Sequence, residues 1–137
     1  MHHFKRQILV AASIVVALVV PALATQTVTV KFAEIPPAGA GPDSQGNIAG
    51  TVTGLEKAET YKVVLYAHTD AWYVQPLTDD PYTDIGPDGE WSNWTHLGYR
   101  YAALVVRPSF KPQFKSQSLP HVGGDVIAKA EVPAKGN

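Results

Sequence analysis

Aromatic side chains placed beside polar ones are the residues of this chain best suited to bind a ligand. All three Trp and all six Tyr fall between positions 61 and 101. The C–H face of a sugar packs on an outward Trp or Tyr ring, while neighbouring amides, carboxylates and imidazoles bond the hydroxyls. This segment therefore predicts a carbohydrate-binding surface, whose expected ligand-binding residues are Trp72, Tyr73, Gln75, Tyr82, Trp94 and His96.

Two other interpretations of the same rings stay open. Trp is largely buried in most proteins, so these rings can fill a core or lie under a loop. Exposed apolar rings also mark protein–protein interfaces. Trp72 and Tyr73 are adjacent, and adjacent side chains of an extended chain point to opposite faces, so one of the two leaves the interior. A loop such as residues 108–124 can still cover it.

The same alternation separates Trp91 from Trp94. They are three positions apart in an extended segment, an odd spacing that places them on opposite faces. Trp91 shares its face with Asn93, Thr95 and Leu97, whereas Trp94 shares its face with the polar residues Ser92 and His96. We therefore expect Trp91 in the core and Trp94 nearer the solvent.

Metal-ligating patterns are weak in this sequence. The segment TDDPYTDIGPDGE carries carboxylates of the kind that Ca²⁺ prefers, where a bound metal would be structural. Its spacing matches no established calcium loop, and Asp-Pro and Asp-Gly pairs are ordinary turn chemistry. His68, His96 and His121 lie too far apart in sequence to form the i, i+2 or i, i+4 pairs typical of metal sites. We expect solvated turns, no metal and no cofactor.

Catalytic patterns are weaker still. The chain has no cysteine and no Gly-x-Ser-x-Gly nucleophile elbow. Its paired carboxylates lie in the turn-rich acidic segment, where water keeps them ionised and unfit as general acids at neutral pH. We predict a protein that is not an enzyme, with a triad assembled from distant residues as the alternative.

The first residues predict export. Lys5 and Arg6 precede an apolar run over residues 8–20, and Ala22 and Ala24 supply small residues for a signal peptidase. That run is shorter than the roughly 20 residues that a membrane-spanning helix needs. We predict a helical signal peptide over residues 1–24, with an uncleaved anchor as the alternative, and no later membrane span. The predicted location is secreted, periplasmic or on the cell surface.

The composition of residues 25–137 limits the classes of protein further. Their length suits one domain with its own core. Nine Lys and Arg face twelve Asp and Glu, so no basic surface invites nucleic acid. An exported chain without cysteine has no disulfide framework, which is common in bacteria, so its stability must come from packing.

β-Strands are the elements that must position the rings. No window of a dozen residues shows helical periodicity, whereas alternation of apolar and polar residues recurs between turn signals. The segment YAALVV is apolar on both faces, as expected of a strand that is covered from both sides. We predict an all-β, antiparallel two-sheet sandwich of about seven to eight strands, at residues 27–32, 47–54, 61–69, 72–75, 82–85, 90–96, 101–108 and 125–132.

Four motifs follow one another within residues 61–108: Trp-Tyr-x-Gln-Pro, Asp-Gly-x-Trp, Thr-His-x-Gly and Ala-Ala-Leu-Val. In this order they resemble a small immunoglobulin-like β-sandwich module of bacterial exported proteins, which occurs alone, beside glycoside hydrolases or in surface proteins. The matching residues are Tyr61, Trp72, Tyr73, Gln75, Pro76, Asp88, Gly89, Trp91, Thr95, His96, Gly98, Tyr101, Leu104 and Pro108.

The resemblance implies a fold of the immunoglobulin or fibronectin III type and a non-catalytic accessory role linked to polysaccharide. Together with the aromatic residues, it predicts a secreted or cell-surface module that recognises carbohydrate or cell-envelope polymer. The alternative is a structural or assembly module that makes protein–protein contacts at the cell surface.

Overall fold

The computed structural model describes residues 27–136, so the predicted signal peptide lies outside the described residues. Within this range the chain is almost entirely β-structure, and its single 3-10 turn is no candidate for a membrane-spanning helix. The elements are β1 (Thr29–Glu34), β2 (Gln45–Thr53), η1 (Ala58–Thr60), β3 (Lys62–His68), β4 (Trp72–Gln75), β5 (Thr83–Asp84), β6 (Glu90–His96), β7 (Arg100–Val106), β8 (Lys115–Ser116) and β9 (Val126–Pro133).

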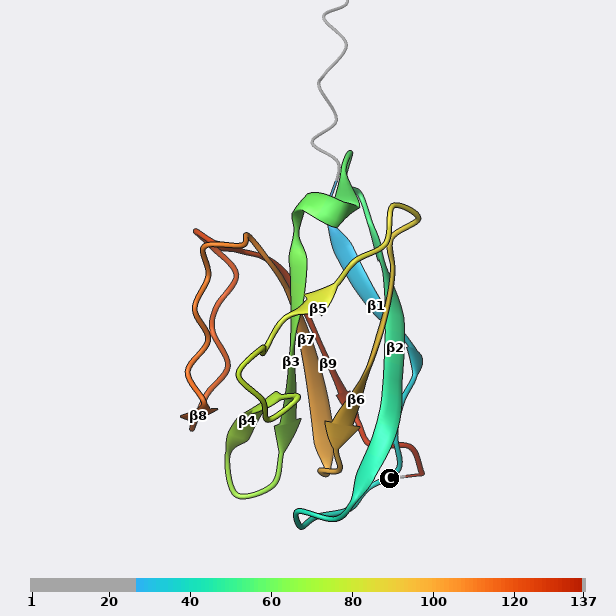
Figure 1. Cartoon of the computed structure of the whole chain (residues 1–137), viewed down its shortest axis with the longest axis vertical. Coiled ribbons are helices and arrows are strands. Elements are labelled where there is room, and N and C mark those ends of the chain that lie inside the picture. Colours follow the sequence, from blue (N-terminus) through green and yellow to red (C-terminus); the bar gives the residue numbers. More distant parts are fainter. Residues whose placement is uncertain (1–26, 137) are drawn as a thin grey trace, which may run out of the picture.

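The strands form two antiparallel sheets that pack face to face (Figure 1). One sheet has the order β1-β2-β6. The other has the order β8-β4-β3-β7-β9, with β5 paired to one end of β3. The chain changes sheet after β2, after β5 and again after β6, as in sandwiches of the immunoglobulin type. The predicted two-sheet sandwich is confirmed.

The main core lies between the sheets and follows the predicted alternation. Val30, Ile48 and Val52 of the small sheet meet Val63 and Leu65 of β3 in one apolar cluster. Strand side chains alternate between faces, so every second residue of these segments enters the core.

A second apolar cluster covers the outer face of the large sheet. The other faces of β3 and β7 contribute Val64, Leu104 and Val106, which pack with Leu119 from residues 107–125. That loop runs beside the sheet down to β8 (Figure 1). The prediction that YAALVV is covered on both faces is therefore confirmed. β8 itself was not predicted, because its two polar residues carry no strand pattern and pair only with the edge strand β4.

A buried tyrosine fixes the corner between β6 and β7. The Tyr101 hydroxyl accepts a hydrogen bond from the Gly98 N–H at 3.0 Å and donates one to the Pro37 carbonyl at 2.8 Å. A tyrosine near the start of this strand that bonds back to the preceding corner is a hallmark of immunoglobulin-type sandwiches. It ties the end of β6 to the β1–β2 connection.

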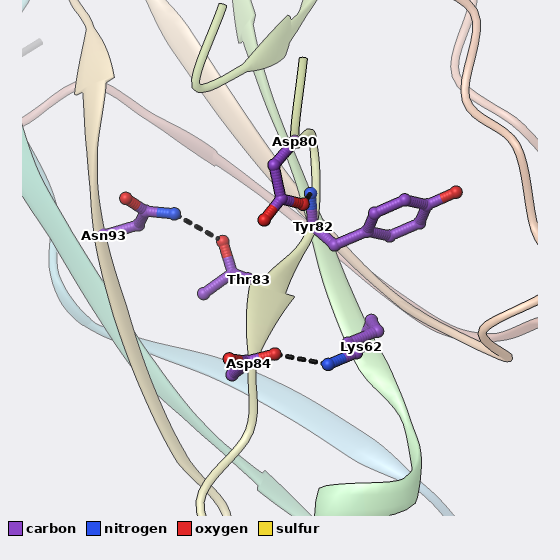
Figure 2. A network of polar contacts seen from close by, with 6 residues as sticks. All are labelled: Lys62, Asp80, Tyr82, Thr83, Asp84 and Asn93. Carbon is purple, nitrogen blue, oxygen red and sulfur yellow. Dashed lines mark hydrogen bonds and ion pairs between the residues drawn. The ribbon is translucent and has the colours of Figure 1, made fainter. Parts of the chain in front are cut away.

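Polar side chains close the side of the sandwich where β6 has no paired neighbour. β6 pairs with β2 along one edge only. Opposite its free edge, β5 places Thr83 so that its hydroxyl accepts a hydrogen bond from the Asn93 side-chain amide at 2.9 Å (Figure 2). Further along, the side chain of Gln75 bonds to His96. These two bonds tie β6 to β5 and β4 of the other sheet.

Candidate ligand-binding surface

β6 brings Trp94 to the outer face of the small sheet. Trp94 lies opposite Asn47 in the pairing with β2 and is half-buried. Its ring meets that of His96 edge to face, with centroids 5.3 Å apart. Trp91, on the other face, is only 3% exposed and packs against Phe32. The prediction that Trp91 enters the core while Trp94 lies nearer solvent is confirmed.

A shallow depression, here called the outer hollow, extends from Trp94 along the same face. The part beside Trp94 has a volume of about 460 Å³ and includes Glu34 and Asn47 in its lining. It shares Ser92 and Asn93 with a larger part of about 560 Å³ that continues towards β5. The larger part is lined by Ala33, Ala49, Gly50, Thr51, Tyr82, Thr83, Asp84, Glu90, Trp91, Ser92 and Asn93.

A second depression, the end groove, lies at the end of the sandwich on the other side of His96. Its volume is about 230 Å³. Tyr73 and Gln75, which alternate onto one face of β4, line it together with His96. The rest of the lining is mostly apolar and comes from four separate segments: Gly41 and Pro42, Ala67 and Thr69, Leu77, and Leu97.

Gln75 is the most buried polar residue of the end groove, at 1% exposure. Its Oε1 accepts a hydrogen bond from the backbone N–H of His96 at 3.0 Å and lies 3.2 Å from the His96 Nδ1. A backbone N–H requires an acceptor, so this contact fixes which end of the amide is oxygen. The Gln75 Nε2 makes no hydrogen bond within residues 27–136, but this nitrogen is not sealed from solvent, since the buried side-chain atom without a partner there is the Trp91 Nε1.

Tyr73 is held by a charged pair at the rim of the end groove. Its hydroxyl donates to Asp70 at 3.0 Å, and Lys115 Nζ lies 3.4 Å from the other Asp70 oxygen. The hydrogen bond from Tyr73, followed by that from Thr69, lowers the pKa of the Asp70 carboxyl. Lys115 also lies 5.4 Å from the Tyr73 ring centroid. These contacts orient the ring without sealing it, since Tyr73 remains half-buried.

Trp72 does not join this surface, whereas Tyr82 lines the larger part of the outer hollow but not the end groove. Trp72 points to the opposite face of β4, is 7% exposed, and belongs to the cluster under residues 107–125. A ring packed under a loop offers no face to a ligand, so Trp72 lies apart from the other expected ligand-binding residues. The Tyr82 hydroxyl donates to the Phe110 carbonyl, and Figure 2 shows the ring directed away from Asn93.

Four of the six expected residues are therefore contiguous: Tyr73, Gln75, Trp94 and His96. His96 is the link, because its ring contacts Trp94 on one side and Gln75 on the other. The sequence did not single out Asn47 and Leu97. Asn47 could have been identified from the sequence, because alternation places its side chain on the other face of the strand from Ile48. Leu97 follows the last residue of the predicted strand.

The acidic segment is used for turns and for one ion pair. The carboxylate of Asp80 accepts the Tyr82 N–H, and that of Asp88 accepts the Glu90 N–H. Asp84 pairs with Lys62 across β5 and β3 (Figure 2). Within residues 27–136, no three His, Asp or Glu side chains are grouped so that they could hold a metal ion.

A further cavity of about 380 Å³ lies under residues 107–125, apart from the outer hollow and the end groove. Tyr66, which is 2% exposed, lines it together with Phe110 and Leu119. Burial raises the pKa of the Tyr66 hydroxyl to about 12.

Comparisons of the chain with protein-family models, with curated proteins and with solved structures gave no match. The resemblance of residues 61–108 to bacterial sandwich modules thus stays a prediction from the sequence. The candidate surface is supported by the geometry of its own residues.

Proposed function

We propose that this protein is a non-catalytic module that recognises carbohydrate, such as a cell-envelope polymer, along β6. The observation that carries this proposal is Trp94, a half-buried indole on a polar sheet face beside the outer hollow. The predicted signal peptide would deliver such a module to the outside of the cytoplasmic membrane.

The chemistry of this surface suits a sugar chain. An indole ring attracts the C–H face of a pyranose, and the side chains of Asn47, Ser92 and Asn93 supply donors and acceptors for hydroxyls. The outer hollow is open to solvent, which suits a segment of polymer better than an enclosed small molecule. With one stacked ring, the dissociation constant should fall on the order of micromolar to millimolar.

A second candidate function is assembly through protein–protein contacts. It is favoured by three large apolar side chains that are exposed: Tyr99, Val122 and Phe114, whose ring centroid lies 6.1 Å from that of Tyr73. Exposed apolar groups of this kind are found at protein interfaces. Sedimentation velocity over a range of concentrations tests this function, which predicts a growing sedimentation coefficient in the absence of sugar.

The carbohydrate proposal is tested by titrating the protein with soluble oligosaccharides and measuring binding by calorimetry. At least one of the cello-, xylo-, manno- and chito-oligosaccharides should bind. Trp94→Ala should weaken that binding at least tenfold while the circular dichroism spectrum stays unchanged. Tyr99→Ala is the matched control, because it removes an exposed ring outside the surface. Absence of binding to the whole panel at millimolar concentrations would contradict the proposal.

A further inference from the structure

We propose that the end groove binds the acetamido group of an N-acetylated sugar, so that the polymer recognised along β6 is an N-acetylhexosamine-containing glycan. This inference rests on the proposed function and names its ligand class. It follows from one free donor, one free acceptor and an apolar wall that meet in a single small groove.

The donor is the side-chain amide of Gln75. Its Oε1 is engaged by His96, and its Nε2 makes no hydrogen bond within the described residues and is not sealed from solvent. This N–H is therefore free to donate to a ligand acceptor in the groove. The carbonyl oxygen of an acetamido group is such an acceptor, and it is neutral.

The acceptor is the ring of His96. Oε1 of Gln75 can only accept, so the contact at 3.2 Å requires the proton of the neutral imidazole to be on Nδ1. Nε2 then carries a lone pair, and it has no partner among the described residues. The N–H of an acetamido group can donate to this lone pair. An O-acetyl ester has no such hydrogen, which distinguishes the two kinds of acetyl group.

The wall of the end groove fits a methyl group. Pro42, Leu77 and Leu97 surround the polar pair with apolar surface. A bare sugar hydroxyl would lose its water there without gaining enough hydrogen bonds. A carboxylate would need a cation, and Lys115, the basic residue beside Tyr73, is paired with Asp70. An acetamido group offers a methyl group to the apolar wall, a carbonyl oxygen to the Gln75 amide and an N–H to the His96 ring.

The groove and the ring of Trp94 are close enough to act on one ligand. The His96 imidazole contacts both: its ring centroid lies 5.3 Å from that of Trp94, and its Nδ1 lies 3.2 Å from the Gln75 Oε1. A sugar that stacks on Trp94 can therefore place the acetamido group of the same unit, or of the next one, in the end groove.

The test compares three soluble tetrasaccharides by calorimetry: chitotetraose, its de-N-acetylated form and cellotetraose. The protein should bind chitotetraose at least tenfold more tightly than the other two. Gln75→Glu keeps the acceptor for the His96 N–H and removes the amide donor, so it should reduce this preference to less than threefold. Leu77→Trp, which narrows the groove from the loop side, is the second variant in case the first fails to fold.

The outcomes separate this inference from the proposed function. If cellotetraose and chitotetraose bind equally well and both require Trp94, the groove is not an acetamido site and the proposed function stands. A preference for chitotetraose that survives in both variants also overturns the inference. If none of the three sugars, nor the wider panel, binds, the proposed function fails and the inference fails with it.

Discussion

Replacing Tyr101 by Phe should destabilise the sandwich while leaving its core volume unchanged. The hydroxyl makes two hydrogen bonds, with the Gly98 N–H at 3.0 Å and the Pro37 carbonyl at 2.8 Å, and the side chain is fully buried. A buried hydrogen bond contributes about 1 kcal/mol net, and an orphaned buried donor costs about 1–3 kcal/mol. We therefore expect the free energy of unfolding to fall by about 2 kcal/mol, which corresponds to about 8 °C in Tm for a domain of this size.

Urea denaturation, followed by tryptophan fluorescence, measures this loss. Tyr99→Phe is the matched control, because Tyr99 is exposed two residues away and its change should leave the urea midpoint unaltered. A Tyr101→Phe variant within about 0.5 kcal/mol of the parent, the size of an ordinary surface effect, would refute the assignment of the corner bond as a stabilising element.

Three further predictions follow from particular contacts. Gly50→Ala would place a Cβ 2.3 Å from the Trp91 ring and 2.0 Å from a backbone carbonyl oxygen of β1, so unfolding experiments should show a loss of about 3 kcal/mol or more. The pKa of the Tyr66 hydroxyl is about 12 in the folded protein and 10.0 in the unfolded chain. The free energy of unfolding should therefore fall by about 2 kcal/mol as the pH rises from 10 to 12. Urea denaturation of Tyr66→Phe should lack this part of the decrease. The pKa of Asp70, followed by NMR, should rise in Tyr73→Phe because the donated hydrogen bond that lowers it is lost; an unchanged value would show that Tyr73 does not hold this carboxylate.

Much of the fold was predictable from short-range alternation. The bounds of β4 and β6 match the predicted ranges, and the buried residues Val30, Ile48 and Val52 follow the period-two patterning of their segments. Alternation predicts these residues because a strand that buries one face must place its apolar side chains on that face.

The candidate surface was only partly predictable, because it depends on how distant segments meet. Alternation shows that Trp72 and Tyr73 diverge, but it does not say which face a loop will cover. Leu119 and its neighbours cover the Trp72 side, and no local sequence pattern predicts which side is covered. The bond between Gln75 and His96 joins residues 21 positions apart in two different sheets, so it becomes visible only when the sandwich is assembled.

The most direct test of carbohydrate recognition along β6 is an NMR titration of the isotopically labelled protein with chitotetraose. The three indole N–H signals act as internal reporters, since Trp94 is on the candidate surface while Trp72 and Trp91 are buried elsewhere. Recognition as proposed here predicts saturable shifts of the Trp94 indole and of the Gln75 side-chain amide, with little change at the other two indoles. Shifts centred on the exposed residues Tyr99 and Val122, or no shifts at millimolar sugar, would contradict it.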